Sequence, residues 1–257
     1  MRINKSYILP VIGLLTATGL LLYGPIAQEP SYHSFADTRT MLGIPSCLNV
    51  ITNLPFAVVA FLGLSTTSNI IEKRLKLICT TIFIAFLLLA VGSGYYHLHP
   101  NNNALVYDRI PISIITMSLF SFIIYDRVHH RKGYFAFIIL NMVGVLSVIY
   151  WILTEHAGKG DLRWYGMVQF FPLIAIPLTL WMYKSSNHYT REIVWMFLFF
   201  ALTKLAETYD KAIYPLLSNT VSGHSLKHLS MAAAGYEIAL LFRRIKKGNL
   251  PFISCLS

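Results

Sequence analysis

The sequence predicts an all-α polytopic membrane protein, with a core of seven transmembrane helices and one extra N-terminal helix. Hydrophobic residues make up 55% of the 257 residues and charged residues only 12%. A soluble domain carries roughly twice that charged fraction. A membrane-spanning helix needs about 20 mostly apolar residues. The chain holds eight such stretches, at about 7–26, 47–66, 76–96, 110–126, 134–154, 165–183, 192–210 and 223–243.

The first stretch predicts a membrane helix or signal anchor. Arg2 and Lys5 followed by an apolar run resemble a signal peptide. However, the run is long for that role, and the residues at 24–27 make a poor cleavage site. We therefore expect three parts: an N-terminal helix (1–29), a seven-helix domain (30–245) and a basic cytoplasmic tail (246–257).

The basic residues lie mostly on one side of the predicted membrane. Fourteen lysines and arginines fall near the N-terminus, in alternate loops and near the C-terminus. The opposite loops hold five: Arg39, Arg109, Lys159, Arg163 and Lys211. Cytoplasmic loops are enriched in lysine and arginine, so both termini are expected in the cytoplasm. The formal net charge of +10 therefore indicates topology and no nucleic-acid partner. The short loops favour a bacterial inner membrane.

Two short motifs place polar side chains four residues apart beside apolar segments. They contain Ser93 and His97 in one segment and His224 and His228 in the other. Residues i and i+4 of a helix lie on one face. Asp108 lies just before the next predicted span. With the N-terminus inside, all five residues fall at the external ends of three helices.

These residue types suit a catalytic zinc site. Three neutral imidazoles with an open fourth position form a catalytic zinc ligand set, here expected from His97, His224 and His228. Zinc lowers the pKa of its bound water to about 7. Asp108 would act as general base, and Ser93 would hydrogen-bond the water or the developing oxyanion.

The other histidines are expected to be interfacial or hydrogen-bonded residues without a ligand role. His99 is the nearest alternative ligand, because it lies two residues from His97. On a helix, however, residues i and i+2 do not face the same way.

The motif residues resemble those of a known family. The segment Gly92-Ser-Gly-Tyr-Tyr-His97, then Asp108, then His224-Ser-Leu-Lys-His228 resembles the alkaline ceramidases. It also resembles the wider superfamily of seven-helix hydrolases often called CREST, which includes the adiponectin and progestin receptors. The segment 45–53, with Asn49 and Asn53, looks like the family's first core helix. The resemblance covers about residues 30–245.

The resemblance implies a membrane-embedded, zinc-dependent amidase that cleaves a ceramide-like lipid to a long-chain base and a fatty acid. The expected partners are this lipid amide and the surrounding membrane lipids. The family's calcium-binding acidic cluster has no counterpart, because residues 28–46 contain only Glu29 and Asp37 as acids. Calcium takes six to eight oxygen ligands, so we do not expect a calcium site. The sequence does not indicate an oligomeric state.

Two other functions fit the same motifs. A non-enzymatic zinc-containing receptor or regulator would have a closed site, with Asp108 as fourth ligand. A proton or ion transporter would continue the polar relay across the membrane, but no charged residue follows His228 inward until Glu237.

Further polar residues have alternative roles. Asp37 and Arg39 would either brace the rim of the site or be solvated. Lys204, Glu207 and Asp210 lie three residues apart near the external end of the seventh predicted span. Either Lys204 and Glu207 would form an ion pair, or a carboxylate of this set would orient a zinc-bound histidine. Lys227, between the two histidines of the last span, is expected to extend outward to the membrane surface.

Overall fold

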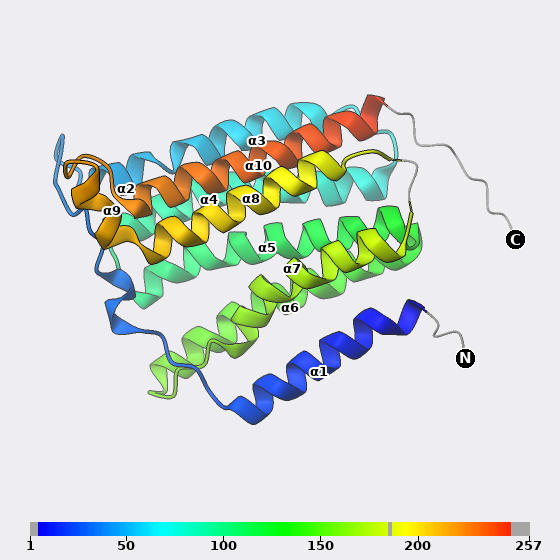
Figure 1. The fold of residues 1–257 in the computed structure, drawn as a ribbon, viewed down its shortest axis with the longest axis horizontal. Helices are drawn as coiled ribbons and strands as arrows, with labels where there is room; N and C mark the ends of the chain where they lie inside the picture. Colours follow the sequence, from blue (N-terminus) through cyan, green and yellow to red (C-terminus); the bar gives the residue numbers. More distant parts are fainter. Residues whose placement is uncertain (1–4, 185–186, 248–257) are drawn as a thin grey trace, which may run out of the picture.

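The protein is a bundle of helices. The computed structural model describes residues 5–184 and 187–247, and this part contains no β-strand, only one isolated β-bridge. The long helices run side by side in alternating directions (Figure 1). The elements are η1 (Lys5–Tyr7), α1 (Ile8–Tyr23), η2 (Pro30–His33), α2 (Cys47–Ile51), α3 (Leu54–Thr67), α4 (Lys73–Leu98), α5 (Asn102–Arg127), α6 (His130–His156), α7 (Arg163–Met182), α8 (Thr190–Thr208), α9 (Asp210–Leu216) and α10 (Gly223–Lys247).

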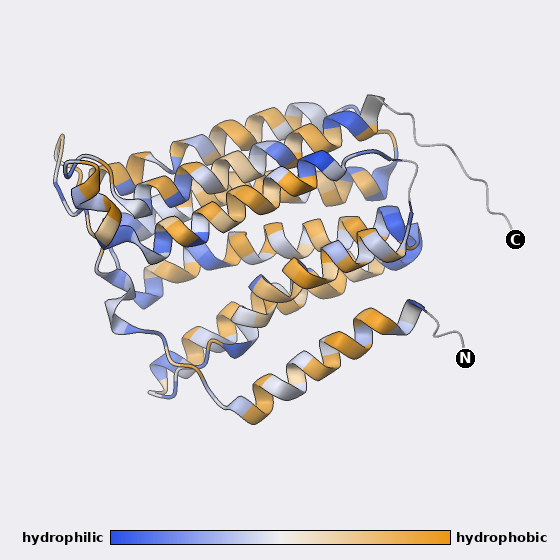
Figure 2. Cartoon of the chain, in the orientation of Figure 1, coloured by the Kyte–Doolittle hydropathy of each residue, from blue (hydrophilic) through white to orange (hydrophobic). Residues whose placement is uncertain are grey.

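The helices have the lengths and surfaces of a multi-pass membrane protein. Five segments are long and apolar enough to cross a membrane: Cys47–Thr67, Lys73–Leu98, Asn102–Arg127, His130–His156 and Arg163–Met182. Helix α1 is apolar but shorter. Apolar residues dominate the middle of the helices, and hydrophilic residues gather toward the two ends of the bundle (Figure 2).

Two predicted spans differ from the observed helices. The stretch 47–66 is divided into α2 and α3 at Thr52 and Asn53, because Pro55 in the first turn of α3 lacks the N–H that a continuous helix needs. The stretch 192–210 ends at Thr208, where the chain turns into α9. Most of the predicted basic tail, from residue 248 onward, lies outside the described residues.

Helices α7 and α8 pack against different neighbours in the bundle. Helices α4, α5 and α6 pack in sequence, and α7 packs against α5 and α6. Helix α8 instead packs against α10, which also contacts α3. Helices α7 and α8 therefore form opposite walls of the cavity described below.

Helices α4 and α5 approach most closely near the predicted site. A Cβ atom added at Gly92 would lie 2.1 Å from the carbonyl oxygen of Tyr107, whereas one at Gly94 would meet no atom within 4 Å. Such a contact forces backbone movement. The close approach places Ser93 next to Asp108, so the Gly-Ser-Gly segment has a packing reason as well as a chemical one.

We expect Gly92→Ala to destabilise the protein by about 1–3 kcal/mol, the usual cost of overpacking. Gly94→Ala is the matched control and should be neutral or slightly stabilising, because alanine favours helix. Thermal unfolding in detergent would measure both variants. Equal unfolding temperatures for the two variants would contradict this description of the α4–α5 contact.

Candidate metal centre

The three histidines predicted as ligands lie together. His97 comes from the last turns of α4, and His224 and His228 from the first two turns of α10. One nitrogen of each lies within 4.8 Å of the others, and all three side chains are buried. The Nε2 atoms of His97 and His228 are 3.2 Å apart. The group could therefore bind a metal ion.

The start of α10 is held in place by polar contacts and one glycine. The Asp210 carboxylate accepts a hydrogen bond from the His224 backbone N–H at 2.7 Å, which compensates a donor that lacks a helical partner. The Ser222 hydroxyl accepts from the Ser225 N–H at 3.1 Å. A Cβ at Gly223 would lie 2.3 Å from the Ala206 carbonyl oxygen. These contacts fix where the two α10 histidines project.

The neighbours of His228 determine which of its nitrogens is free. Thr52 Oγ1 lies 2.7 Å from the Leu48 carbonyl oxygen and 2.9 Å from His228 Nδ1. A hydroxyl has one proton, and the carbonyl can only accept it. His228 Nδ1–H must then donate to Thr52, so the lone pair of Nε2 is available to a metal. Zinc-bound histidines are commonly oriented in this way.

This hydrogen bond makes Thr52 a testable supporting residue. We expect Thr52→Val to weaken metal affinity about 10–100-fold, the usual cost of losing such a partner. Thr52→Ser keeps the hydroxyl and should retain near wild-type affinity. Competition for zinc against a fluorescent chelator measures both. Unchanged affinity in the valine variant would show that Thr52 does not orient His228.

The nitrogen positions fit a metal ion. Two nitrogens bound to one tetrahedral zinc ion at about 2.0–2.1 Å lie about 3.3–3.4 Å apart, close to the observed His97–His228 separation. His224 Nε2 is buried and has no hydrogen-bond partner in the described part of the chain. Within 5–184 and 187–247, no fourth histidine, cysteine or carboxylate joins this group. His97 Nδ1, unlike Nδ1 of His228, also has no hydrogen-bond partner there.

An aromatic side chain covers the histidines from the loop before α2. The Phe35 ring centroid lies 4.8 Å from that of His97 and 4.5 Å from that of His224. Asp37 is buried, pairs with Arg39 at 2.7 Å and accepts from Asn49 through its backbone carbonyl. The Arg39 guanidinium holds the pKa of Asp37 below its usual range. Asp37 therefore braces the loop and is not solvated. No motif in the sequence indicated this position of Phe35 over the histidines.

Ser93 and Asp108 are buried beside one another. Ser93 lies one turn before His97 on α4, and its hydroxyl hydrogen-bonds the Asp108 carboxyl group on α5. Asp108 does not belong to the three-histidine group and instead lines a neighbouring cavity. Within the described residues, Asp108 is therefore separate from the three histidines that could hold a metal ion.

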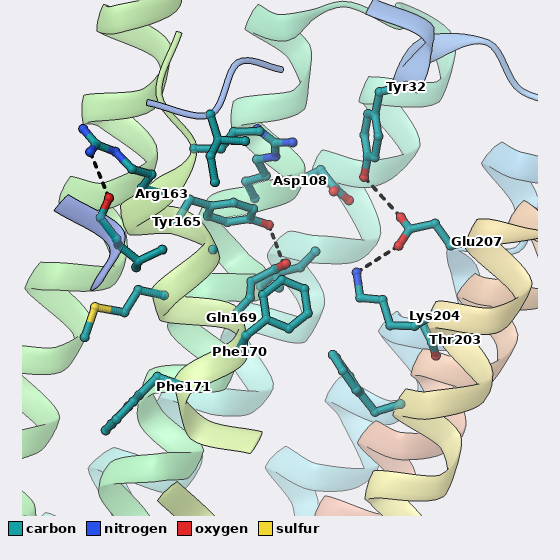
Figure 3. Close-up of a pocket in the computed structure, with 18 of the residues that line it drawn as sticks. Tyr32, Asp108, Arg163, Tyr165, Gln169, Phe170, Phe171, Thr203, Lys204 and Glu207 are labelled. Atoms are coloured by element: carbon teal, nitrogen blue, oxygen red, sulfur yellow. Dashed lines mark hydrogen bonds and ion pairs between the residues drawn. The ribbon is translucent and has the colours of Figure 1, made fainter. Parts of the chain in front are cut away.

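A cavity of about 470 Å³ lies between α7 and α8. Tyr32, Lys204 and Glu207 meet at one end, close to Asp108, and the side chains of Phe170 and Phe171 line its walls further along α7 (Figure 3). A smaller apolar cavity extends it toward the middle of the bundle. The two share the lining residues Ile112, Gln169, Phe200 and Met231.

The polar end of the cavity corrects one prediction and supports another. Lys227 does not extend outward as predicted, because its Nζ donates to Glu207 at 2.6 Å. The predicted Lys204–Glu207 ion pair is present at 2.9 Å. Glu207 also accepts from the Tyr32 hydroxyl at 3.2 Å. In the part of the chain that the structure describes, its hydrogen bonds are thus to two lysines and a tyrosine and not to a histidine. His99 is exposed and lies outside the metal group.

Comparison with protein-family models, with curated proteins and with solved structures finds no match for the chain. The resemblance to the alkaline ceramidases therefore depends on the motif residues and their spacing.

Proposed function

We propose that the protein is a membrane-embedded, zinc-dependent amidase that hydrolyses a ceramide-like lipid to a long-chain base and a fatty acid. One observation carries the proposal: three buried histidines form a group with no fourth protein ligand among the described residues, and Ser93, one turn before His97, hydrogen-bonds the buried Asp108 carboxyl group. A structural zinc site is usually closed by four protein ligands, whereas a catalytic site keeps one position open.

Zinc held by His97, His224 and His228 would supply a bound water that ionises near neutral pH. Asp108 would accept a proton from that water and return it to the nitrogen of the breaking C–N bond. The water oxygen would add to the carbonyl carbon, giving the acid and the amine. The Ser93 hydroxyl would hold the Asp108 carboxylate in position through their hydrogen bond.

The cavity supports a lipid substrate. Its polar end is close to Asp108, and its walls become apolar toward the smaller adjoining cavity. A lipid amide could place its amide at the polar end and an alkyl chain along the apolar part. Burial of each methylene group contributes about 0.8 kcal/mol, so a long chain would supply much of the binding free energy.

The proposed membrane arrangement has a seven-helix core preceded by α1, with both termini in the cytoplasm. Helix α1 begins and α10 ends at one end of the bundle, and α4 ends and α10 begins at the other (Figure 1). The uneven distribution of lysine and arginine supports a cytoplasmic location for the first end. The metal centre would then face the periplasmic side of a bacterial inner membrane.

Metal removal tests the proposed reaction. Purified protein would be incubated with a panel of N-acyl lipids that includes ceramide, and fatty-acid release would be measured. We expect release to stop after treatment with a zinc chelator and to return when zinc, but not calcium, is added. Release that is insensitive to chelation would contradict the proposal. Bound zinc without release from any N-acyl lipid would instead favour a regulator.

A further inference from the structure

Arg109 is a buried cation without a carboxylate ion-pair partner among the described residues. It follows Asp108 on α5, is 4% exposed and lines the large cavity. In the described part of the chain it forms no ion pair, and its Nη1 atom has no hydrogen-bond partner. Its Nη2 atom donates to Gln28 Oε1 at 2.5 Å. A buried charge is costly unless paired, so its retention needs an explanation.

Aromatic rings hold the Arg109 guanidinium in a fixed position. Its central carbon lies 4.0 Å from the ring centroid of Trp151, 4.7 Å from that of Tyr165 and 5.6 Å from that of Tyr32. Cation–π contacts of this kind stabilise a desolvated cation. They offer no hydrogen-bond acceptor to Nη1, however. The guanidinium is therefore oriented in advance, with one donor group still unsatisfied.

The polar end of the cavity has an excess of positive charge. Arg109, Lys204 and Lys227 contribute three cations, and Asp108 and Glu207 contribute two carboxylates. Glu207 bonds both lysines, and Asp108 bonds Ser93. A metal ion bound to the histidines would increase the excess further.

Arg163, on the same cavity wall, provides a contrast. It pairs with Asp161 at 2.8 Å. Burial raises the pKa of Asp161, but hydrogen bonds from Arg163 outweigh that effect and lower it to about 2. The Arg163 charge is thus neutralised within the protein, unlike that of Arg109.

We propose that the polar end of the cavity binds the anionic headgroup of an acyl lipid, a carboxylate or a phosphate, with Arg109 as its main ligand. The planar guanidinium fork matches both groups. The identity of the substrate, unlike the binding of the headgroup, rests on the proposed amidase activity. If both hold, the substrate is an N-acyl lipid with an acidic headgroup, in preference to neutral ceramide. The amide would lie near Asp108, the residue next to Arg109 in the chain.

Binding of lipids that lack an amide bond tests this inference separately from hydrolysis. The metal-loaded protein in nonionic detergent would be titrated calorimetrically with two matched pairs. Hexadecyloxyacetate against hexadecyloxyacetamide tests a carboxylate, and hexadecyl phosphate against its dimethyl ester tests a phosphate. We expect at least one anion to bind about 10–100-fold more tightly than its neutral partner, as charge-assisted hydrogen bonds imply. The pair with the larger ratio identifies the headgroup.

Two variants test whether Arg109 causes the preference for anionic over neutral lipids. Arg109→Gln should reduce the anion-to-neutral ratio to about one, whereas Arg163→Gln, the matched control, should leave the ratio unchanged. Equal binding of anionic and neutral lipids by the wild-type protein would overturn the inference, whatever the stability of the variants. Ceramide hydrolysis without an anion preference would overturn it and leave the amidase standing. An anion preference without amide hydrolysis would support it and count against the amidase.

Discussion

Replacement of His228 by alanine is expected to remove the bound metal and abolish amide hydrolysis. His228 supplies a nitrogen 3.2 Å from that of His97, and its free lone pair is set by Thr52. Four-ligand zinc sites bind with about 10–16 kcal/mol, or about 2.5–4 kcal/mol per ligand, so affinity should fall about 10²–10³-fold. Elemental analysis and fatty-acid release measured on the same samples would check both effects.

His99→Ala is the matched control for that variant. His99 is exposed and close to His97 in sequence but does not belong to the metal group. It should keep a full equivalent of zinc and wild-type turnover. If the His228 variant retained its metal, or if the His99 variant lost it, the ligand assignment would be wrong.

Asp108→Asn is expected to retain zinc but to lose about 10²–10⁴-fold in kcat, the usual contribution of a general base. Asparagine has nearly the same shape, but its amide cannot accept the proton from water. Zinc should remain because Asp108 is not among the clustered ligands. Turnover at saturating lipid, normalised to bound zinc, would measure the effect.

The result for Asp108 distinguishes two kinds of site. Loss of zinc in the asparagine variant would indicate that Asp108 is a fourth ligand, as in a closed structural centre. Asp126→Asn provides the control, because Asp126 is also a buried carboxylate on α5 but pairs with Arg127 at the other end of the helix. It should leave zinc content and turnover per bound zinc unchanged.

Residues that share one face of a single helix could be predicted from the sequence. The four-residue spacing of His224 and His228 indicated a shared face, and their grouping with His97 followed from the expected alternation of helix directions. The apolar stretches predicted the long helices well, because hydrophobicity over about 20 residues is a local property. The interruption at Thr52 and Asn53 lay within one such stretch and was not predicted.

Contacts between segments far apart in the chain could not be predicted from residue spacing or hydrophobicity. Thr52 meets His228 across 176 positions in the sequence. Arg109 was counted among the external loop charges, but the structure buries it against Trp151 and Tyr165. Lys227 was expected to reach the surface, whereas Glu207 on α8 holds it inside. Each of these depends on which helices become neighbours, and hydrophobic periodicity alone does not specify that.

The metal content of the purified wild-type protein, measured with fatty-acid release from N-acyl lipids on the same sample, tests the central claim most directly. We predict one equivalent of zinc per chain and release that is proportional to bound zinc across partly depleted samples. A folded, active protein without zinc, or release that does not follow zinc content, would contradict the assignment of the three histidines as a catalytic metal centre.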